Sequence, residues 1–151
     1  MISLSLMNEG TFLLVLIWAA WQDWKRRSIS LNGLLTAGSI GFIFTVLLER
    51  SCTQIVMSCG IGILLLILGK CTDGGIGDGD GWFFLVSGLY MDWQENLRLF
   101  LSGLFLCFGV SLILIVKGRL GRGRRGMKLP FLPFLLPTGI EMISVTLRLL
   151  Q

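Results

Sequence analysis

The chain has 151 residues and a net charge of +4; 54% of the residues are hydrophobic and only 15% are charged. A soluble globular domain usually has about 25% charged residues, so this composition, with a mean hydropathy of +0.80, excludes an ordinary soluble protein. We predict one all-α, polytopic integral membrane domain over residues 1–151. The absence of histidine excludes Ser-His-Asp catalysis, Cys-His catalysis and zinc-histidine chemistry.

The sequence contains no motif typical of a cysteine-based site and no signal typical of secretion. Its four cysteines form no Cys-x-x-Cys pair and no zinc knuckle, so we interpret them as small apolar fillers of the interior. The first ten residues contain neither lysine nor arginine, so we do not expect a cleavable secretory signal. The cysteines are Cys52, Cys59, Cys71 and Cys107.

The first apolar segment extends from Ile2 to Trp21, and residues 21–27 at its end read Trp-Gln-Asp-Trp-Lys-Arg-Arg. Tryptophan is typical of the membrane interface, and basic clusters are typical of the cytoplasmic side. We therefore expect the first segment to cross the membrane with the N-terminus outside.

Five further apolar segments follow, and most of them are near the ~20 residues that a crossing needs. The fourth is short between Trp82 and Trp93, and it is long enough only if it is counted from Ile76. The five segments are predicted at residues 31–48, 53–69, 76–93, 99–116 and 129–147.

The distribution of positive charge indicates whether the fourth segment crosses. If all six segments cross, ten of the 13 basic residues lie on the inner side, including those of the densely basic residues 117–128. If the fourth segment did not cross, residues 117–128 would lie outside, against the positive-inside rule. We therefore predict six transmembrane helices. We expect residues 117–128 to contact membrane lipid and not nucleic acid.

Small residues recur at four-residue spacing in the second and third segments. In membrane helices this spacing lets two backbones approach closely. A general tolerance of glycine in such helices is an equally good explanation. The residues are Gly33, Ala37 and Gly41 in the second segment and Ser58 and Gly62 in the third.

Residues 73–81 form the densest acidic stretch, with three aspartates and five glycines between two apolar segments. In the six-span topology, Asp80 and Asp23 fall at one depth near the inner face. Two carboxyls that lie close together share one proton, and the ionised member can activate a water for attack on a peptide carbonyl. The alternatives are an ion pair of Asp23 with Arg26 or Arg27, and a solvated loop position for Asp80.

Three other acids are weaker candidates. Asp73 and Asp78 lie in the same stretch, but the spacing fails for a calcium loop. We expect both to be solvated acids that attract a basic peptide. Glu141 lies near the middle of the sixth segment, where an acid is a functional candidate by default. We expect its role to be a structural hydrogen bond to another helix.

Three motifs in order resemble the type IV prepilin peptidase family. Asp23, with Ile29 six residues later and basic residues between, resembles the first aspartate motif of that family. Residues 77–80, Gly-Asp-Gly-Asp, fit its GxGD motif. Residues 130–135, Pro-Phe-Leu-Pro-Phe-Leu, are similar to its C-terminal Pro-Phe-Gly-Pro-Phe-Leu signature.

The resemblance implies a membrane aspartyl endopeptidase of a bacterial cell membrane, which needs no metal or organic cofactor. Such an enzyme removes the basic leader of prepilins or pseudopilins at the cytoplasmic face. Asp23 and Asp80 hold the positions of the two catalytic aspartates. Substrate contacts are expected from the GxGD and proline motifs, at Gly77, Asp78, Gly79, Pro130 and Pro133.

The chain departs from the family pattern at two positions. Trp82 stands where lysine is common, and Ser30 stands where proline is common. Both departures concern substrate contacts rather than the aspartate pair. The cysteine-rich region of the longer family members is also absent, so we expect peptidase activity without N-methylation.

Two other functions are compatible with the sequence. In a small proton- or cation-coupled transporter or channel, Asp78, Asp80 and Glu141 would form the relay. In a non-enzymatic scaffold for a pilus or secretion machine, both Asp23 and Asp80 would be replaceable.

Overall fold

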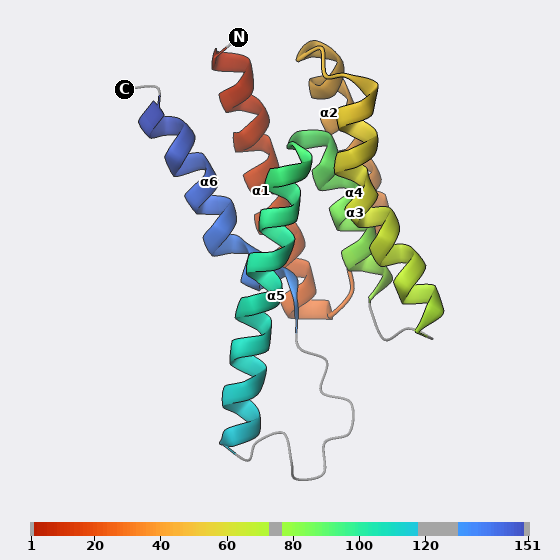
Figure 1. Ribbon diagram of the computed structural model, residues 1–151, viewed down its shortest axis with the longest axis vertical. Helices are drawn as coiled ribbons and strands as arrows, with labels where there is room; N and C mark the ends of the chain where they lie inside the picture. The colour runs from red at the N-terminus through yellow and green to blue at the C-terminus, as the bar shows by residue number, and fades with distance from the viewer. Residues whose placement is uncertain (1, 73–76, 118–129, 150–151) are drawn as a thin grey trace.

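The computed structural model describes residues 2–72, 77–117 and 130–149, and within these ranges it contains helices and no strand (Figure 1). The prediction of an all-α fold is therefore confirmed. The elements in chain order are α1 (Ile2–Arg26), α2 (Leu31–Leu47), α3 (Cys52–Cys71), α4 (Asp78–Tyr90), α5 (Trp93–Val116), the short 3₁₀ helix η1 (Leu132–Leu135) and α6 (Leu136–Leu149).

Consecutive α-helices alternate in direction, so their connections fall at two ends of an elongated bundle (Figure 1). The terminal end holds both chain termini and the α2–α3 and α4–α5 connections, with Arg50 and Asp92. The aspartate end is where α1 finishes and α4 begins, with Asp23 and Asp80. This alternation suits the six-span topology, whose number of membrane crossings stays a prediction.

Polar caps determine where several helices begin. Ser30 and Ser51 each accept a backbone N–H of the first turn that follows, at the starts of α2 and α3. Asp92 and Glu95 form a reciprocal capping box, in which the Asp92 N–H donates to Glu95 Oε2 at 3.3 Å. This box starts α5 at Trp93, earlier than the residue 99 that the hydrophobic run alone predicts.

Two other predicted boundaries are also wrong. The first helix does not end at Trp21 but continues to Arg26, and it therefore includes Asp23. The last segment does not begin as an α-helix at residue 129, because the 3₁₀ helix η1 precedes α6. Pro133 and Pro137 lack an N–H group, and each fits only the first turn of a helix, which divides this segment in two.

α4 packs against α3 and α2 with very close backbone approach. A Cβ atom added at Gly62 would collide with the backbone of Leu85, and one added at Gly88 would lie 2.7 Å from the Cys59 nitrogen. A Cβ added at Gly41 would lie 2.6 Å from the Tyr90 ring. The predicted packing through small residues is therefore confirmed for these helices.

Buried hydrogen bonds fix the C-terminal part of α4. The Tyr90 hydroxyl donates to the Ala37 carbonyl at 2.6 Å, and the Ser58 hydroxyl donates to the Met91 carbonyl at 2.6 Å. Asn96, which is fully buried, donates to the Ser58 carbonyl at 2.8 Å. These bonds satisfy buried polar groups at the end of α4, where the backbone stops being helical before α5 begins.

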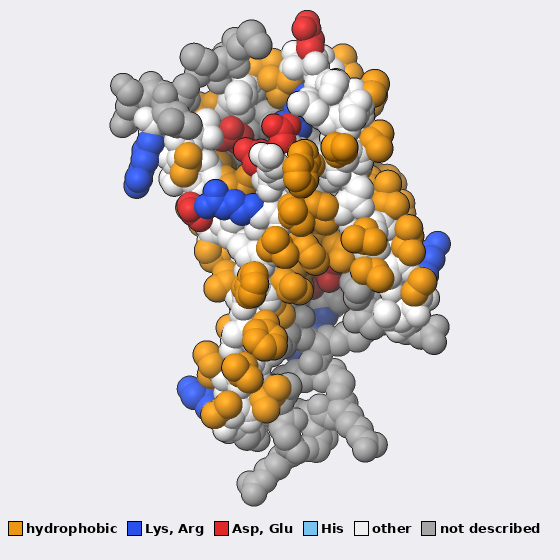
Figure 2. Space-filling model, in the orientation of Figure 1, with side chains coloured by type: hydrophobic (Ala, Val, Ile, Leu, Met, Phe, Trp, Pro, Cys, Tyr) orange, Lys and Arg blue, Asp and Glu red, His pale blue; other side chains and the backbone are white. Residues whose placement is uncertain are grey.

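In the part of the chain that the structure describes, three helices are long and apolar enough to cross a membrane: Leu4–Arg26, Cys52–Cys71 and Trp93–Val116. α2, α4 and α6 are shorter, with 17, 13 and 14 residues. Apolar side chains cover much of the face in Figure 2, including that of α5, where Phe105 and Phe108 are exposed. Such an apolar exterior is typical of helices that face lipid.

Candidate active site

Asp23 lies near the C-terminal end of α1, and its side chain is only 8% exposed. The backbone N–H of Leu132 donates to Asp23 Oδ2 at 3.0 Å. Leu132 belongs to the Pro-Phe-Leu-Pro motif and is the first residue of η1. The first and third sequence motifs, 109 residues apart, therefore meet at one carboxylate.

Asp80 lies in the first turn of α4, where its own N–H donates to the Gly77 carbonyl at 3.0 Å. It is half-buried, while Gly77 and Asp78 are exposed. The Asp80 carboxyl lies within electrostatic range of Asp23. The structure therefore brings together the two aspartates that the sequence singled out.

Small residues allow this approach at the start of α4. A Cβ added at Gly79 would lie 3.2 Å from Ile29 Cδ1, and one added at Gly81 would lie 2.7 Å from Leu66 Cγ. Ile29 is the last residue of the first motif and Gly79 belongs to the GxGD motif. The two motifs therefore contact each other, and a larger side chain at residue 81 would push α4 away from α3.

The aspartate pair lacks a cationic partner in the described part of the chain. Its ion pairs are Arg50–Asp92 at 3.6 Å and Arg98–Glu141 at 2.8 Å, and neither involves Asp23 or Asp80. The alternative in which Asp23 pairs with Arg26 or Arg27 is thus not observed there. Two neighbouring carboxyls without a counter-ion cannot easily both ionise.

The two prolines of the third motif flank the residue that binds Asp23. Pro130 and Pro133 are half-buried, and Pro133 lies in the first turn of η1. Pro133 directly follows Leu132, whose N–H points to Asp23. Substrate contacts at Pro130 and Pro133 stay a prediction, as do those at Gly77, Asp78 and Gly79.

Glu141 forms the ion pair with Arg98 of α5. The expected structural contact with another helix is therefore confirmed, through a partner that the sequence did not identify. Both side chains are more than half exposed. Because Glu141 already has a guanidinium partner, it is a poor member of a proton relay.

Two features of the site have no signal in the sequence. Leu132 acts through its backbone, which no side-chain pattern reveals. Cys107 of α5 is half-buried, and its thiol lies within electrostatic range of Asp80. The interpretation of all cysteines as interior filler is wrong for Cys52 and Cys71, which are exposed.

Residues 2–72, 77–117 and 130–149 contain no group of three or more Cys, Asp or Glu side chains placed to hold a metal ion. Trp82, at the position where lysine was expected, is half-buried and packs against the hydrophobic core. Asp73 and most of the basic residues 117–128 lie outside the described residues.

The sequence model of the type IV leader peptidase family matches residues 10–112. The matched region includes Asp23, Ile29 and the GxGD motif, and it ends before Pro130. No curated protein and no solved structure matches the chain.

Proposed function

Because the chain belongs to the type IV leader peptidase family, we propose that it is an aspartyl endopeptidase that removes the basic leader from prepilins or pseudopilins. The observation that carries this proposal is the meeting of three motifs: Leu132 donates to Asp23, Ile29 lies against Gly79, and Asp23 acts on Asp80. A structural acid at the end of a helix would not need all three.

In this proposal Asp23 and Asp80 share one proton. The ionised carboxylate takes a proton from a water molecule, and the water oxygen attacks the scissile carbonyl carbon. The protonated carboxyl donates its proton to the carbonyl oxygen. The Leu132 N–H occupies Asp23 Oδ2, so we assign contact with the water to Asp23 Oδ1. Collapse of the tetrahedral intermediate then breaks the C–N bond, and the amine leaves with a proton.

We place the reaction at the cytoplasmic face of a membrane that the chain crosses six times. The support is the charge distribution, since ten of the 13 basic residues fall on that side in this topology. The alternating directions of the described helices also put Asp23 and Asp80 at one end of the bundle (Figure 1).

The proposed substrate has a short basic leader followed by an apolar helix. Asp78 is exposed next to the aspartate pair, and its charge would attract the basic leader. Gly77 and Gly79 would let an extended peptide backbone approach the carboxyls. Pro130 and Pro133 would bound the substrate site on the η1 side.

The test is co-expression of the full chain with a candidate prepilin. We expect the pilin to shift to the mass of the leaderless form, with a new N-terminus directly after the basic leader. Glu49→Gln, which also replaces an acid by its amide, is the control variant and should still cleave, because Glu49 is exposed in the α2–α3 connection. Unprocessed prepilin beside well-expressed, membrane-inserted enzyme would contradict the proposal for that substrate class.

A further inference from the structure

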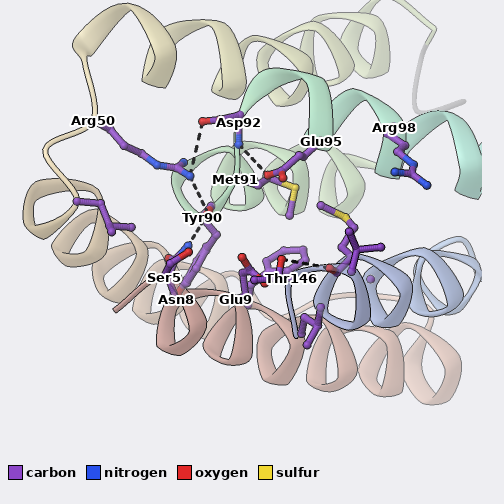
Figure 3. A pocket seen from close by; sticks show the side chains of 16 residues that line it. Ser5, Asn8, Glu9, Arg50, Tyr90, Met91, Asp92, Glu95, Arg98 and Thr146 are labelled. Atoms are coloured by element: carbon purple, nitrogen blue, oxygen red, sulfur yellow. Dashed lines mark hydrogen bonds and ion pairs between the residues drawn. The ribbon is translucent and has the colours of Figure 1, made fainter. Parts of the chain in front are cut away.

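A polar cavity lies at the terminal end of the bundle, away from the aspartate pair (Figure 3). Its volume is about 320 Å³, within the range of pockets that hold small molecules (roughly 300–1,000 Å³). Six parts of the chain enclose it: α1, the α2–α3 connection, the end of α4, the α4–α5 connection, α5 and α6. Phe12, Met142 and Ile143 give it an apolar wall.

The charges around the cavity do not balance. Three carboxylates line it, Glu9, Asp92 and Glu95, and they face two guanidiniums, Arg50 and Arg98. Arg98 is already paired with a fourth acid, Glu141, at 2.8 Å, and Arg50 is paired with Asp92 at 3.6 Å. Four carboxylates against two guanidiniums leave an excess of two negative charges.

Of these four acids, Glu9 and Glu95 form no ion pair within the described residues. The charge of Glu9 acts on Glu95, so two like charges lie within electrostatic range of each other. Glu95 Oε2 accepts the Asp92 N–H of the capping box, and Arg50 also lies within electrostatic range of Glu95. Figure 3 shows Glu9 and Glu95 among the side chains that line the cavity. A cation between them would relieve their repulsion.

Two buried oxygen atoms at this cavity accept no hydrogen bond from the described residues. They are Asn8 Oδ1 and Glu9 Oε2. Asn8 is only 3% exposed and lines the cavity, and its amide nitrogen is held by the Tyr90 carbonyl at 2.6 Å. Because an unsatisfied buried acceptor is unfavourable, both atoms point to a ligand that donates several hydrogen bonds.

We propose that this cavity binds a primary ammonium group, held by Glu9 and Asn8 with Glu95 opposite. A primary ammonium carries one positive charge and three N–H donors, so it would offset one negative charge and could donate to both unfilled acceptors. A bare metal ion fits less well, because the described residues contain no cluster of three ligating side chains. The ammonium can belong to an ethanolamine phospholipid at the membrane surface or to a free amine.

Lipids and amines that differ only at the nitrogen provide the test. The full chain is purified with equal amounts of phosphatidylethanolamine and phosphatidylcholine, and native mass spectrometry measures the lipid it retains. Choline has no N–H donor. In a second arm, ethanolamine and choline are added to the detergent-solubilised protein, and the melting temperature is measured.

If the ammonium belongs to a lipid, the protein should retain phosphatidylethanolamine in preference to phosphatidylcholine. If it belongs to a free amine, ethanolamine should raise the melting temperature and choline should not. One charge-assisted hydrogen bond corresponds to roughly a tenfold preference, and Glu9→Gln should abolish it. Glu95→Gln, which keeps an acceptor for the cap, should weaken it, and Glu49→Gln should not change it.

The proposal is overturned if neither arm distinguishes the primary ammonium from the quaternary one. It is also overturned if folded Glu9→Gln protein keeps the full preference. Both readouts are independent of leader cleavage, so failure here would leave the proposed peptidase function untouched.

Discussion

The carboxyls at the two ends of the bundle have different neighbours. Near the terminal end, two guanidiniums lie among the acids: Arg98 pairs with Glu141, and Arg50 pairs with Asp92 and lies within electrostatic range of Glu95, whose other acidic neighbour is Glu9. At the aspartate end, Asp23 and Asp80 lie within range of each other, and the nearest observed partner is the Leu132 N–H. An acid with a guanidinium partner stabilises helix contacts, whereas two acids that face each other are unfavourable unless they share a proton. The second arrangement is the one suited to chemistry.

Both ends depend on α4, which begins next to Asp80 and ends at Tyr90. A substitution can therefore act on one end alone, or on both through α4. Variants chosen on this basis separate catalytic roles from structural ones.

The largest effect is expected for Asp23→Asn and Asp80→Asn. Each variant replaces one carboxyl of the proposed catalytic pair by an amide, and leader cleavage should fall by about 10³-fold or more. Because Asn nearly matches Asp in size, protein level and melting temperature should stay near wild type. The measurement is the rate of leader loss from a purified prepilin. Cleavage within a few-fold of wild type in either variant would remove the pair from the mechanism.

A substitution between the two ends should disturb both. In Gly62→Ala the new Cβ collides with the Leu85 backbone, and overpacking of this kind costs roughly 1–3 kcal/mol of unfolding free energy. Gly60→Ala is the matched control in the same helix, because a Cβ at Gly60 meets nothing within 4 Å. There alanine should be neutral or stabilising. Thermal unfolding that ranks the two variants equally would contradict the close α3–α4 contact.

A change at the aspartate end should slow cleavage. Leu132→Pro removes the N–H that holds Asp23. Because proline also disfavours the αR backbone of the preceding Phe131, the melting temperature of each variant is measured and only folded protein is compared. Leu132→Ala keeps that N–H and loses the same buried side chain. If the N–H positions Asp23, the proline variant should cleave on the order of 10- to 100-fold more slowly than the alanine variant. Equal kcat values for the proline and alanine variants would show that Leu132 contributes only through the packing of its side chain.

The smallest effect is expected at the terminal end. Glu141→Gln breaks the ion pair with Arg98, whose side chains are 60% and 55% exposed. An exposed pair contributes about 1 kcal/mol or less, so the unfolding free energy should change little, and leader cleavage should not change. A large loss of cleavage would instead favour the transporter-like alternative in which Glu141 belongs to a relay.

The sequence predicted the all-α fold and singled out Asp23 and Asp80. Hydrophobic runs, and acids placed at the ends of such runs, can be recognised from the sequence alone. The predicted start of α5 is too late in the chain, because hydropathy gives no sign of the capping box formed by Asp92 and Glu95. Sequence reasoning missed Leu132, since a backbone donor carries no side-chain signature. The partner of Glu141 also depends on how α5 packs against α6, and that register is tertiary information.

The cavity at Glu9 illustrates the same limit. Glu9 reads in the sequence only as a residue that weakens an apolar segment. Its neighbours Asn8, Glu95 and Arg50 come from three separate parts of the chain. Only the packed bundle shows that these residues line a single cavity, and that acids and hydrogen-bond acceptors there lack partners.

The most direct test of the central claim is chemical cross-linking of residues 23 and 80. Asp23→Cys and Asp80→Cys are introduced into a chain whose four native cysteines are replaced by alanine, and a short bifunctional methanethiosulfonate is added. Mass spectrometry should find a 23–80 link, and none for the control pair Asp23→Cys with Asp92→Cys, because Asp92 lies beyond the far end of α4, roughly 18 Å from residue 80 at helical rise. If the control pair links as readily, or if 23 and 80 fail to link although each reacts alone, the two aspartates do not meet and the peptidase mechanism is wrong.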